Sequence, residues 1–100
     1  MRENVWYRSS AAVNVPAWED RGSLSIGEGA FQFIGKSRSV GGSIILVGRT
    51  QMGTNKWVHV RYDDQGQARD AYFMDGGALG WAGVLGGNKR LAAEFGAAAT

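Results

Sequence analysis

The sequence predicts a small domain built mainly of antiparallel β-strands, arranged as a barrel or orthogonal sandwich of six or seven strands and closed by one C-terminal helix. Several short segments alternate apolar and polar residues with the period of a half-buried strand. Glycine makes up 16 of the 100 residues, about twice its average usage, which favours the tight turns that join short strands. One segment near the C-terminus has helical spacing of its apolar residues instead.

The clearest predicted element is a β-hairpin over residues 22–35. Apolar side chains alternate with serines in its first arm and with Ala30 and Gln32 in its second arm. Glycines between the arms allow the backbone angles of a tight loop. The alternating apolar residues are therefore expected to face one core: Leu24, Ile26, Phe31 and Phe33.

Further strands are predicted on both sides of this hairpin. Residues 4–15 are rich in β-branched and aromatic side chains and predict one strand, or two short ones. The continuous apolar run 44–47, bounded by glycines, predicts a buried strand. Residues 57–62 and 69–74 predict two strands joined by a turn at residues 63–66. Turns or loops are expected at residues 18–22, 36–42 and 51–55.

The strand over residues 57–62 has two different faces. Val58, Val60 and Tyr62 fall on one side, and Trp57, His59 and Arg61 on the other.

The C-terminal helix is predicted to begin after Asn88, which is a good N-cap residue. Leu91, Ala92 and Phe95 form a narrow apolar stripe that is expected to cover an open corner of the curled sheet. Residues 78–85 are either a short helix or a packed loop. The length of 100 residues predicts that residues 1–100 form a single domain.

Composition excludes several classes of site. The chain has no cysteine, which excludes disulfides, zinc ribbons and thiol catalysis and favours a reducing, cytoplasmic setting. No apolar h-region follows the N-terminal residues, so no signal peptide is predicted. No apolar run approaches the roughly 20 residues of a transmembrane helix. We therefore expect a cytoplasmic protein, with peripheral membrane contact as the alternative.

Charge is unevenly distributed along the chain, although the net charge is only +2. Residues 29–62 contain five cations and no carboxylate, whereas residues 63–75 contain four carboxylates and one arginine. These charges either pair across antiparallel strands or form a one-sided basic face. The low net charge gives little support to nucleic-acid binding. The five cations are Lys36, Arg38, Arg49, Lys56 and Arg61.

No set of catalytic or metal-binding residues is recognisable. His59 is the only histidine, and it is expected to be a surface or interface residue because no motif supplies a nucleophile or a second metal ligand. Asp63 and Asp64 are expected to cap their own turn. The glycines of residues 76–87 lack the Gly-Lys-Ser/Thr of a phosphate-binding loop. We therefore expect a protein that is not an enzyme and has no cofactor or metal.

The four tryptophans are numerous for a chain of this length. They pack in the core, or some of them form an exposed aromatic patch that binds a partner chain or a membrane interface. Trp57 lies opposite the apolar face of its strand, and Trp81 lies in a glycine-rich apolar segment. These two are the candidates for a partner-binding role.

The order of elements resembles the pleckstrin-homology-like superfold, especially its bacterial and GRAM-like members. The resemblance runs from about residue 18 to residue 98. Its motifs are the Gly22-Ser-Leu-Ser-Ile-Gly hairpin with Phe31-Gln-Phe33, then Trp57-Val-His-Val-Arg-Tyr62, Ala71-Tyr-Phe-Met74, and residues 79–87 leading into the last helix. Such domains consist of two nearly orthogonal antiparallel sheets capped by a C-terminal helix.

The resemblance implies a non-catalytic interaction module that binds a protein partner or a second copy of itself. The alternative is peripheral binding to anionic membrane lipid through the five cations of residues 29–62. Phosphoinositide-binding members concentrate cations in the loop between their first two strands, but residues 16–22 hold two carboxylates and one arginine here. The later Lys36-Ser-Arg38 segment is a short motif that does not replace that loop.

Overall fold

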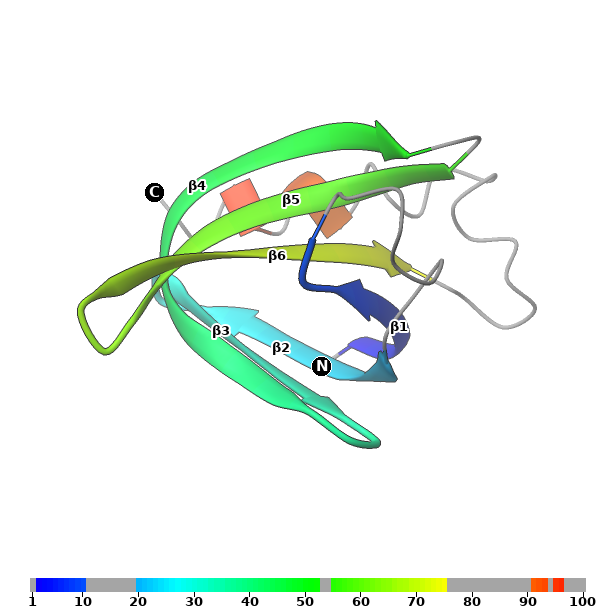
Figure 1. Cartoon of the computed structure of the whole chain (residues 1–100), viewed down its shortest axis with the longest axis horizontal. Helices are drawn as coiled ribbons and strands as arrows, with labels where there is room; N and C mark the ends of the chain where they lie inside the picture. Colours follow the sequence, from blue (N-terminus) through cyan, green and yellow to red (C-terminus); the bar gives the residue numbers. More distant parts are fainter. Residues whose placement is uncertain (1, 11–19, 53–54, 76–90, 94, 97–100) are drawn as a thin grey trace.

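The computed structural model describes residues 2–10, 20–52, 55–75, 91–93 and 95–96. Within these residues, six strands form a closed antiparallel barrel in which each strand pairs with its neighbour in sequence and the first pairs with the last (Figure 1). The strands are β1 (Arg2–Arg8), β2 (Asp20–Gly27), β3 (Ala30–Gly35), β4 (Ser39–Met52), β5 (Asn55–Asp64) and β6 (Gln67–Asp75). The predicted mainly β architecture is therefore confirmed. A seventh strand from residues 11–15 and the conformation of residues 78–85 lie outside the described residues.

Two hairpins of the barrel are closed by two-residue turns. Glu28 and Gly29 join β2 to β3 with φ angles of 55° and 75°, and Gln65 and Gly66 join β5 to β6 with φ angles of 53° and 90°. Two consecutive positive φ angles define the turn whose twist matches that of antiparallel strands. Both turns occur where the sequence predicts them.

The barrel interior is filled by the side chains that alternate along the strands. Leu24 and Phe33 face each other in the β2–β3 ladder, and both are buried. Ile26 is partly buried and packs against the same core, so the predicted inward face of this hairpin is confirmed. On β5, Val58, Val60 and Tyr62 belong to the core, as predicted.

The ring of Phe73 on β6 lies at the centre of the core. Its centroid is 5.5 Å from that of Phe33, 5.6 Å from Phe31, 5.7 Å from Tyr7 and 5.6 Å from Phe95. These separations lie in the range where aromatic pairs attract each other beyond simple burial. One ring thus links β1, β3, β6 and the C-terminal segment.

The C-terminal helical residues cover the core, as the sequence predicts. Residues 91–93 and 95–96 are helical, and the side chains of Leu91 and Phe95 are fully buried. Phe95 stacks on Phe73 with an interplanar angle of 20° and meets the ring of Phe31 edge-on at 76°. In Figure 1 this segment lies between β4 and β6.

The prediction that residues 44–47 form a buried strand is wrong in one respect. The residues do form a strand, but the side chains of Ile45 and Leu46 are 54% and 55% exposed. The β4–β5 register slips between Ile44, which pairs with Tyr62, and Leu46, which pairs with Arg61. This bulge inserts one residue and turns both aliphatic side chains out of the core.

Three predicted loops are partly strand. Residues 20–22 belong to β2, residues 39–42 belong to β4, and the segment predicted as a loop at 51–55 contributes the end of β4 and the start of β5. Polar residues and glycines do not signal a strand locally. They extend the ladders here because neighbouring strands supply backbone partners.

Strand β4 changes neighbours along its length. Residues 39–43 pair with β3, and residues 43–52 pair with β5. At the change-over, a Cβ atom on Gly42 would collide with the backbone oxygen of Asp63, so only glycine fits there. The backbone N–H of Ile44 makes a last hydrogen bond to the Gly29 oxygen at 2.8 Å, and beyond it β4 diverges from β3 (Figure 1).

Replacing Phe95 with alanine tests the closure of the barrel by the C-terminal segment. We expect Phe95→Ala to lower the free energy of unfolding by about 3–5 kcal/mol, because it removes a fully buried ring and leaves a cavity against Phe73. Urea denaturation followed by circular dichroism measures the change. The matched control is Ala93→Ser, an exposed position on the same segment. A loss below about 1 kcal/mol would contradict this packing.

Candidate functional site

The structure separates the five predicted cations along β4 and β5. Lys36 and Arg38 lie in the turn before β4, whereas Arg49 and Lys56 lie toward the other end of the β4–β5 ladder. Arg49 pairs with Val58 and Lys56 with Gln51, so these two cations are diagonal neighbours on one face of that ladder. The cations thus form two separated pairs, with Arg61 between them.

Arg61 belongs to a network on the outer wall of the barrel. Its Nε atom donates to Oδ1 of Asp70 at 3.1 Å, and Nε2 of His59 lies 2.7 Å from the same oxygen. The ring of His59 stacks on Tyr72, with centroids 4.8 Å apart and an interplanar angle of 13°. We call these four residues, His59, Arg61, Asp70 and Tyr72, the His59 cluster.

The electrostatics of the His59 cluster favour an ionised Asp70. The hydrogen bond from Arg61, and then that from His59, hold the pKa of Asp70 below its ordinary value against the opposing effect of burial. Pairing of opposite charges across antiparallel strands is therefore confirmed for Arg61. His59 is partly exposed, at 24% of its side chain. Sequence reasoning missed Asp70 and Tyr72, although the two-residue turn fixes their register opposite Arg61 and His59.

A buried carboxylate holds the turn that carries Lys36 and Arg38. Asp20 is 3% exposed; its Oδ1 accepts hydrogen bonds from the backbone N–H groups of Arg21 at 2.8 Å and Lys36 at 3.0 Å. Its Oδ2 accepts from Ser37 at 2.9 Å and Arg38 at 2.8 Å. Burial by itself raises the pKa of Asp20, but these four backbone hydrogen bonds together bring it below its ordinary value.

The tight packing around the Asp20 carboxylate also explains why residue 35 is a glycine. A Cβ atom on Gly35 would collide with Oδ2 of Asp20, so a larger residue there would push the carboxylate away from the turn. Sequence reasoning placed Asp20 in a turn of its own and missed this role. Three of its four partners lie 16 to 18 residues away, and only the β2–β3 pairing brings them together.

A polar hollow of about 540 Å³ lies beside this turn. Arg38, Tyr62, Asp64, Arg69 and Asp70 contribute to its lining. Its two carboxylates already contact cations, because Asp64 lies 2.8 Å from Nε of Arg69 and Asp70 belongs to the His59 cluster. The lining therefore carries mixed and largely paired charge, and it does not favour a ligand of either sign.

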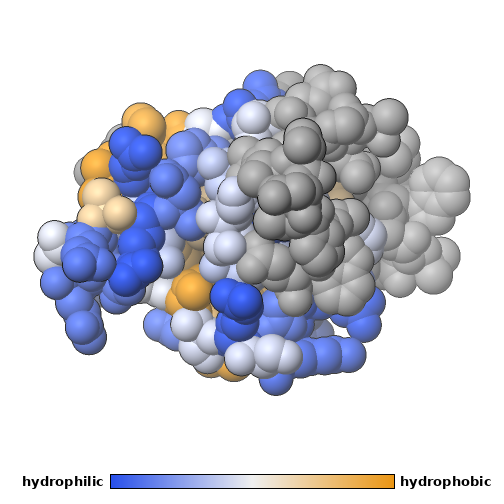
Figure 2. All heavy atoms as spheres, viewed as in Figure 1, coloured by the Kyte–Doolittle hydropathy of each residue, from blue (hydrophilic) through white to orange (hydrophobic). Residues whose placement is uncertain are grey.

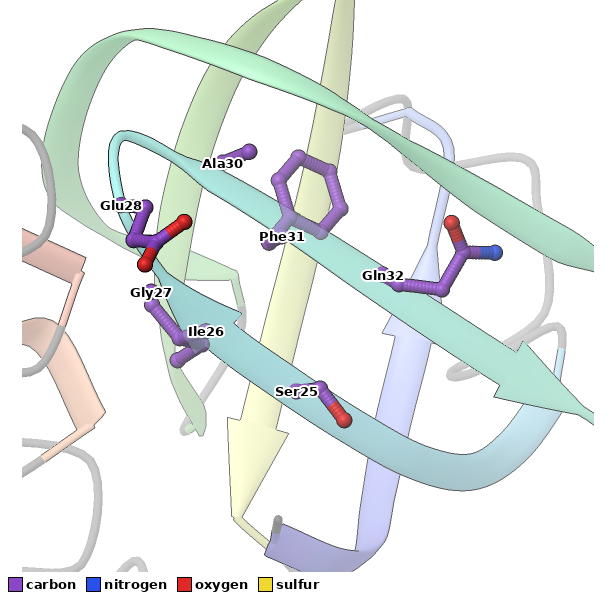
Figure 3. Close-up of a pocket in the computed structure, with 7 residues that line it drawn as sticks. All are labelled: Ser25, Ile26, Gly27, Glu28, Ala30, Phe31 and Gln32. Atoms are coloured by element: carbon purple, nitrogen blue, oxygen red, sulfur yellow. The ribbon is translucent and has the colours of Figure 1, made fainter.

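A second hollow, of about 460 Å³, runs along the β2–β3 hairpin (Figure 3). It is shallow, and Glu28 is the single charged residue in its lining. Phe31 contributes to it from the edge of the core, where its ring contacts Tyr62 and Phe95. A ligand site needs several polar groups that converge on one point, and this hollow does not supply them.

The exposed aliphatic pair on β4 lies next to the His59 cluster. Leu46 is the register partner of Arg61, which places the bulge beside the Arg61–Asp70 ion pair. Figure 2 shows hydrophobic atoms at the upper left of the molecule, beside strongly hydrophilic ones. We define the β4–β5 surface by its residues, Ile45, Leu46, His59, Arg61 and Asp70.

Of the two tryptophans that were predicted to bind a partner, the structure describes only Trp57. Trp57 points outward by the register of β5, yet it is only 2% exposed, and the guanidinium carbon of Arg8 lies 5.8 Å from its ring centroid. The expectation that Trp57 forms an exposed aromatic patch is therefore wrong, because its ring is buried on the outer wall. Trp81 lies outside the described residues.

Comparison with protein-family models, with curated proteins and with solved structures finds no match to this chain. The similarity to pleckstrin-homology-like domains therefore stays a prediction. Among the residues that the structure describes, no group of three or more His, Asp or Glu side chains is placed to hold a metal ion. Within the same residues, no helix has the length and apolar character needed to cross a membrane.

Replacing Asp20 with asparagine tests the anchoring of the Lys36–Arg38 turn. We expect Asp20→Asn to lower the free energy of unfolding by about 1–3 kcal/mol at neutral pH, because an amide nitrogen then faces backbone N–H donors. The folded pKa of Asp20 is depressed, so its contribution is present above the unfolded value of about 3.9 and is lost as pH falls through the folded value. The gap between wild type and variant should therefore shrink below about pH 4.

Urea denaturation at a series of pH values measures this gap. The control is Glu28→Gln at an exposed turn position, which should change stability by less than about 0.5 kcal/mol. A gap between wild type and Asp20→Asn that is the same at pH 7 and pH 3 would show that the ionised carboxylate does not hold the turn.

Proposed function

We propose that this chain is a non-catalytic interaction module that binds a protein partner through the β4–β5 surface. The observation that carries the proposal is the β4 bulge, which turns Ile45 and Leu46 outward together. Without the inserted residue, strand alternation would direct one of two adjacent side chains into the core. Two adjacent large aliphatic side chains are instead exposed to solvent.

The energetics favour a partner that covers this pair. Each aliphatic side chain is a little over half exposed, so covering the pair contributes roughly 1 kcal/mol per side chain. Arg61, His59 and Asp70 flank the pair on β5 and β6. An apolar centre with a polar, charged rim is the usual anatomy of a protein–protein interface.

The His59 cluster supports an interaction role over a catalytic one. Asp70 is shared between Arg61 and His59, and the ring of His59 is stacked on Tyr72. This is the geometry of an ion-pair network that fixes the orientation of surface side chains. A rigid charged rim limits the side-chain entropy that is lost on binding.

The placement of the cations favours a protein partner over an anionic lipid. Attraction to an anionic membrane grows with the number of cations that reach its surface together. Here Lys36 and Arg38 are separated from Arg49 and Lys56 by most of β4, and Arg61 contacts Asp70. The resemblance to bacterial GRAM-like modules agrees with a protein-binding role, as a hypothesis at the level of the fold.

The double variant Ile45→Ser/Leu46→Ser tests the β4–β5 surface. We expect it to reduce the yield of each specifically captured partner about tenfold in affinity capture with quantitative mass spectrometry, because the apolar centre is lost. The matched control is Ile34→Ser, since Ile34 is 57% exposed on β3, away from the bulge. Equal capture by wild type and the double variant would rule out this surface.

Two further measurements separate the alternative partners. Sedimentation velocity of the wild type and the double variant shows whether a second copy of this chain binds to the β4–β5 surface. Flotation with neutral and anionic vesicles, at low and high salt, detects a lipid. Salt-sensitive binding to anionic vesicles that survives the double variant and is lost in Lys36→Glu/Arg38→Glu would replace the protein-binding proposal by the membrane alternative.

A further inference from the structure

The edge of β4 beyond Ile44 is open in the part of the chain that the structure describes. Residues 45–52 pair with β5 on one side, and no described strand pairs with them on the other. Such an edge presents a row of backbone N–H and C=O groups that can template another strand. We call residues 45–52 the open edge of β4.

The side chains along this edge have a defined chemistry. Ile45, Leu46 and Arg49 are exposed, and Lys56 lies diagonally across from Arg49 on β5. The exposed side chains of the edge are therefore aliphatic at its start, at Ile45 and Leu46, and cationic at Arg49. A partner that complements it has apolar side chains and carboxylates.

We propose that the open edge of β4 accepts, as an added antiparallel or parallel strand, an extended segment of a partner protein that alternates apolar residues with Asp or Glu. The inference rests on the proposed protein-binding function, and it names the mode and the chemistry of the partner. In strand addition, main-chain hydrogen bonds provide affinity, and alternating side chains provide specificity. Carboxylates opposite Arg49 add favourable cross-strand pairs.

The same charges disfavour a second copy of this chain at this edge. A symmetric antiparallel pairing of two open edges that is centred near Arg49 places Arg49 of one copy beside Arg49 of the other copy. Like charges on facing strands are destabilising. The occupant that fits is therefore a segment of opposite charge from a different chain.

A synthetic peptide probes the edge directly. The probe is an end-blocked, fluorescein-labelled six-residue peptide of alternating Val and Asp, and the matched control alternates Val and Lys. Fluorescence anisotropy measures affinity, and amide hydrogen exchange by NMR locates the contact on the full chain. We expect the acidic peptide to bind at least about tenfold more tightly than the basic one and to slow exchange of alternate amides in residues 45–50.

Two sets of variants separate charge from backbone pairing. Arg49→Glu should weaken binding of the acidic peptide about tenfold and strengthen binding of the basic peptide. Lys36 is an exposed cation away from the edge, so Lys36→Glu should leave both affinities unchanged. Two versions of the acidic peptide, N-methylated at alternate sets of residues, keep every side chain but remove donors from one edge at a time. At least one of them should lose binding if the peptide pairs as a strand.

The inference is overturned if the acidic peptide binds no better than the basic one, or if protection appears at the β2–β3 hairpin or the Lys36–Arg38 turn instead of on β4. If the Ile45→Ser/Leu46→Ser variant loses its partner while no peptide protects β4, the proposed function stands and strand addition is wrong. If the peptide protects β4 while the Ile45→Ser/Leu46→Ser variant still captures its partner, strand addition at the open edge of β4 stands. The β4–β5 surface is then not the partner site.

Discussion

The packing of four aromatic rings around Phe73 is the interaction on which the barrel depends. Phe73 contacts Tyr7, Phe31, Phe33 and Phe95, and these residues come from β1, β3 and the C-terminal segment. Because Phe73 must point inward, its neighbours along β6 must point outward. The register of β5 against β6 then places the His59 cluster on the outer wall, where its charges remain hydrated and can meet a partner.

The second constraint is that β4 pairs with two different strands along its length. Its first residues close the barrel against β3, and the remainder pairs with β5. Gly42 allows β4 to approach Asp63 at the change-over, and the bulge after Ile44 re-aims the two aliphatic side chains that follow. The exposed apolar pair and the open edge therefore have one geometric origin, which links the way the barrel closes to the surface that we propose for binding.

The sequence predicted the elements whose signal is local. Alternation placed Leu24, Phe33, Val58 and Val60 in the core, and helical spacing placed Leu91 and Phe95 against it. What it could not predict depends on tertiary pairing. The run 44–47 carries no sequence signal for the bulge. The carboxylate of Asp20 binds three backbone N–H groups that lie 16 to 18 residues away. Trp57 is buried on a face that strand alternation assigns to solvent. The contact between Asp70 and His59 could have been predicted from the sequence, because it follows from a hairpin register that the two-residue turn sets.

Within the part of the chain that the structure describes, β4 has an unpaired backbone edge beyond Ile44. Residue-resolved amide hydrogen exchange of the free protein tests this edge most directly. Amides of residues 58–62 lie in a strand with neighbours on both sides, since β4 and β6 flank β5. We predict that they exchange slowly, whereas alternate amides of residues 45–50 exchange rapidly because their N–H groups face solvent. Exchange throughout residues 45–50 that is as slow as that of residues 58–62 would show that the edge is already covered within the chain, and it would contradict the proposed strand addition.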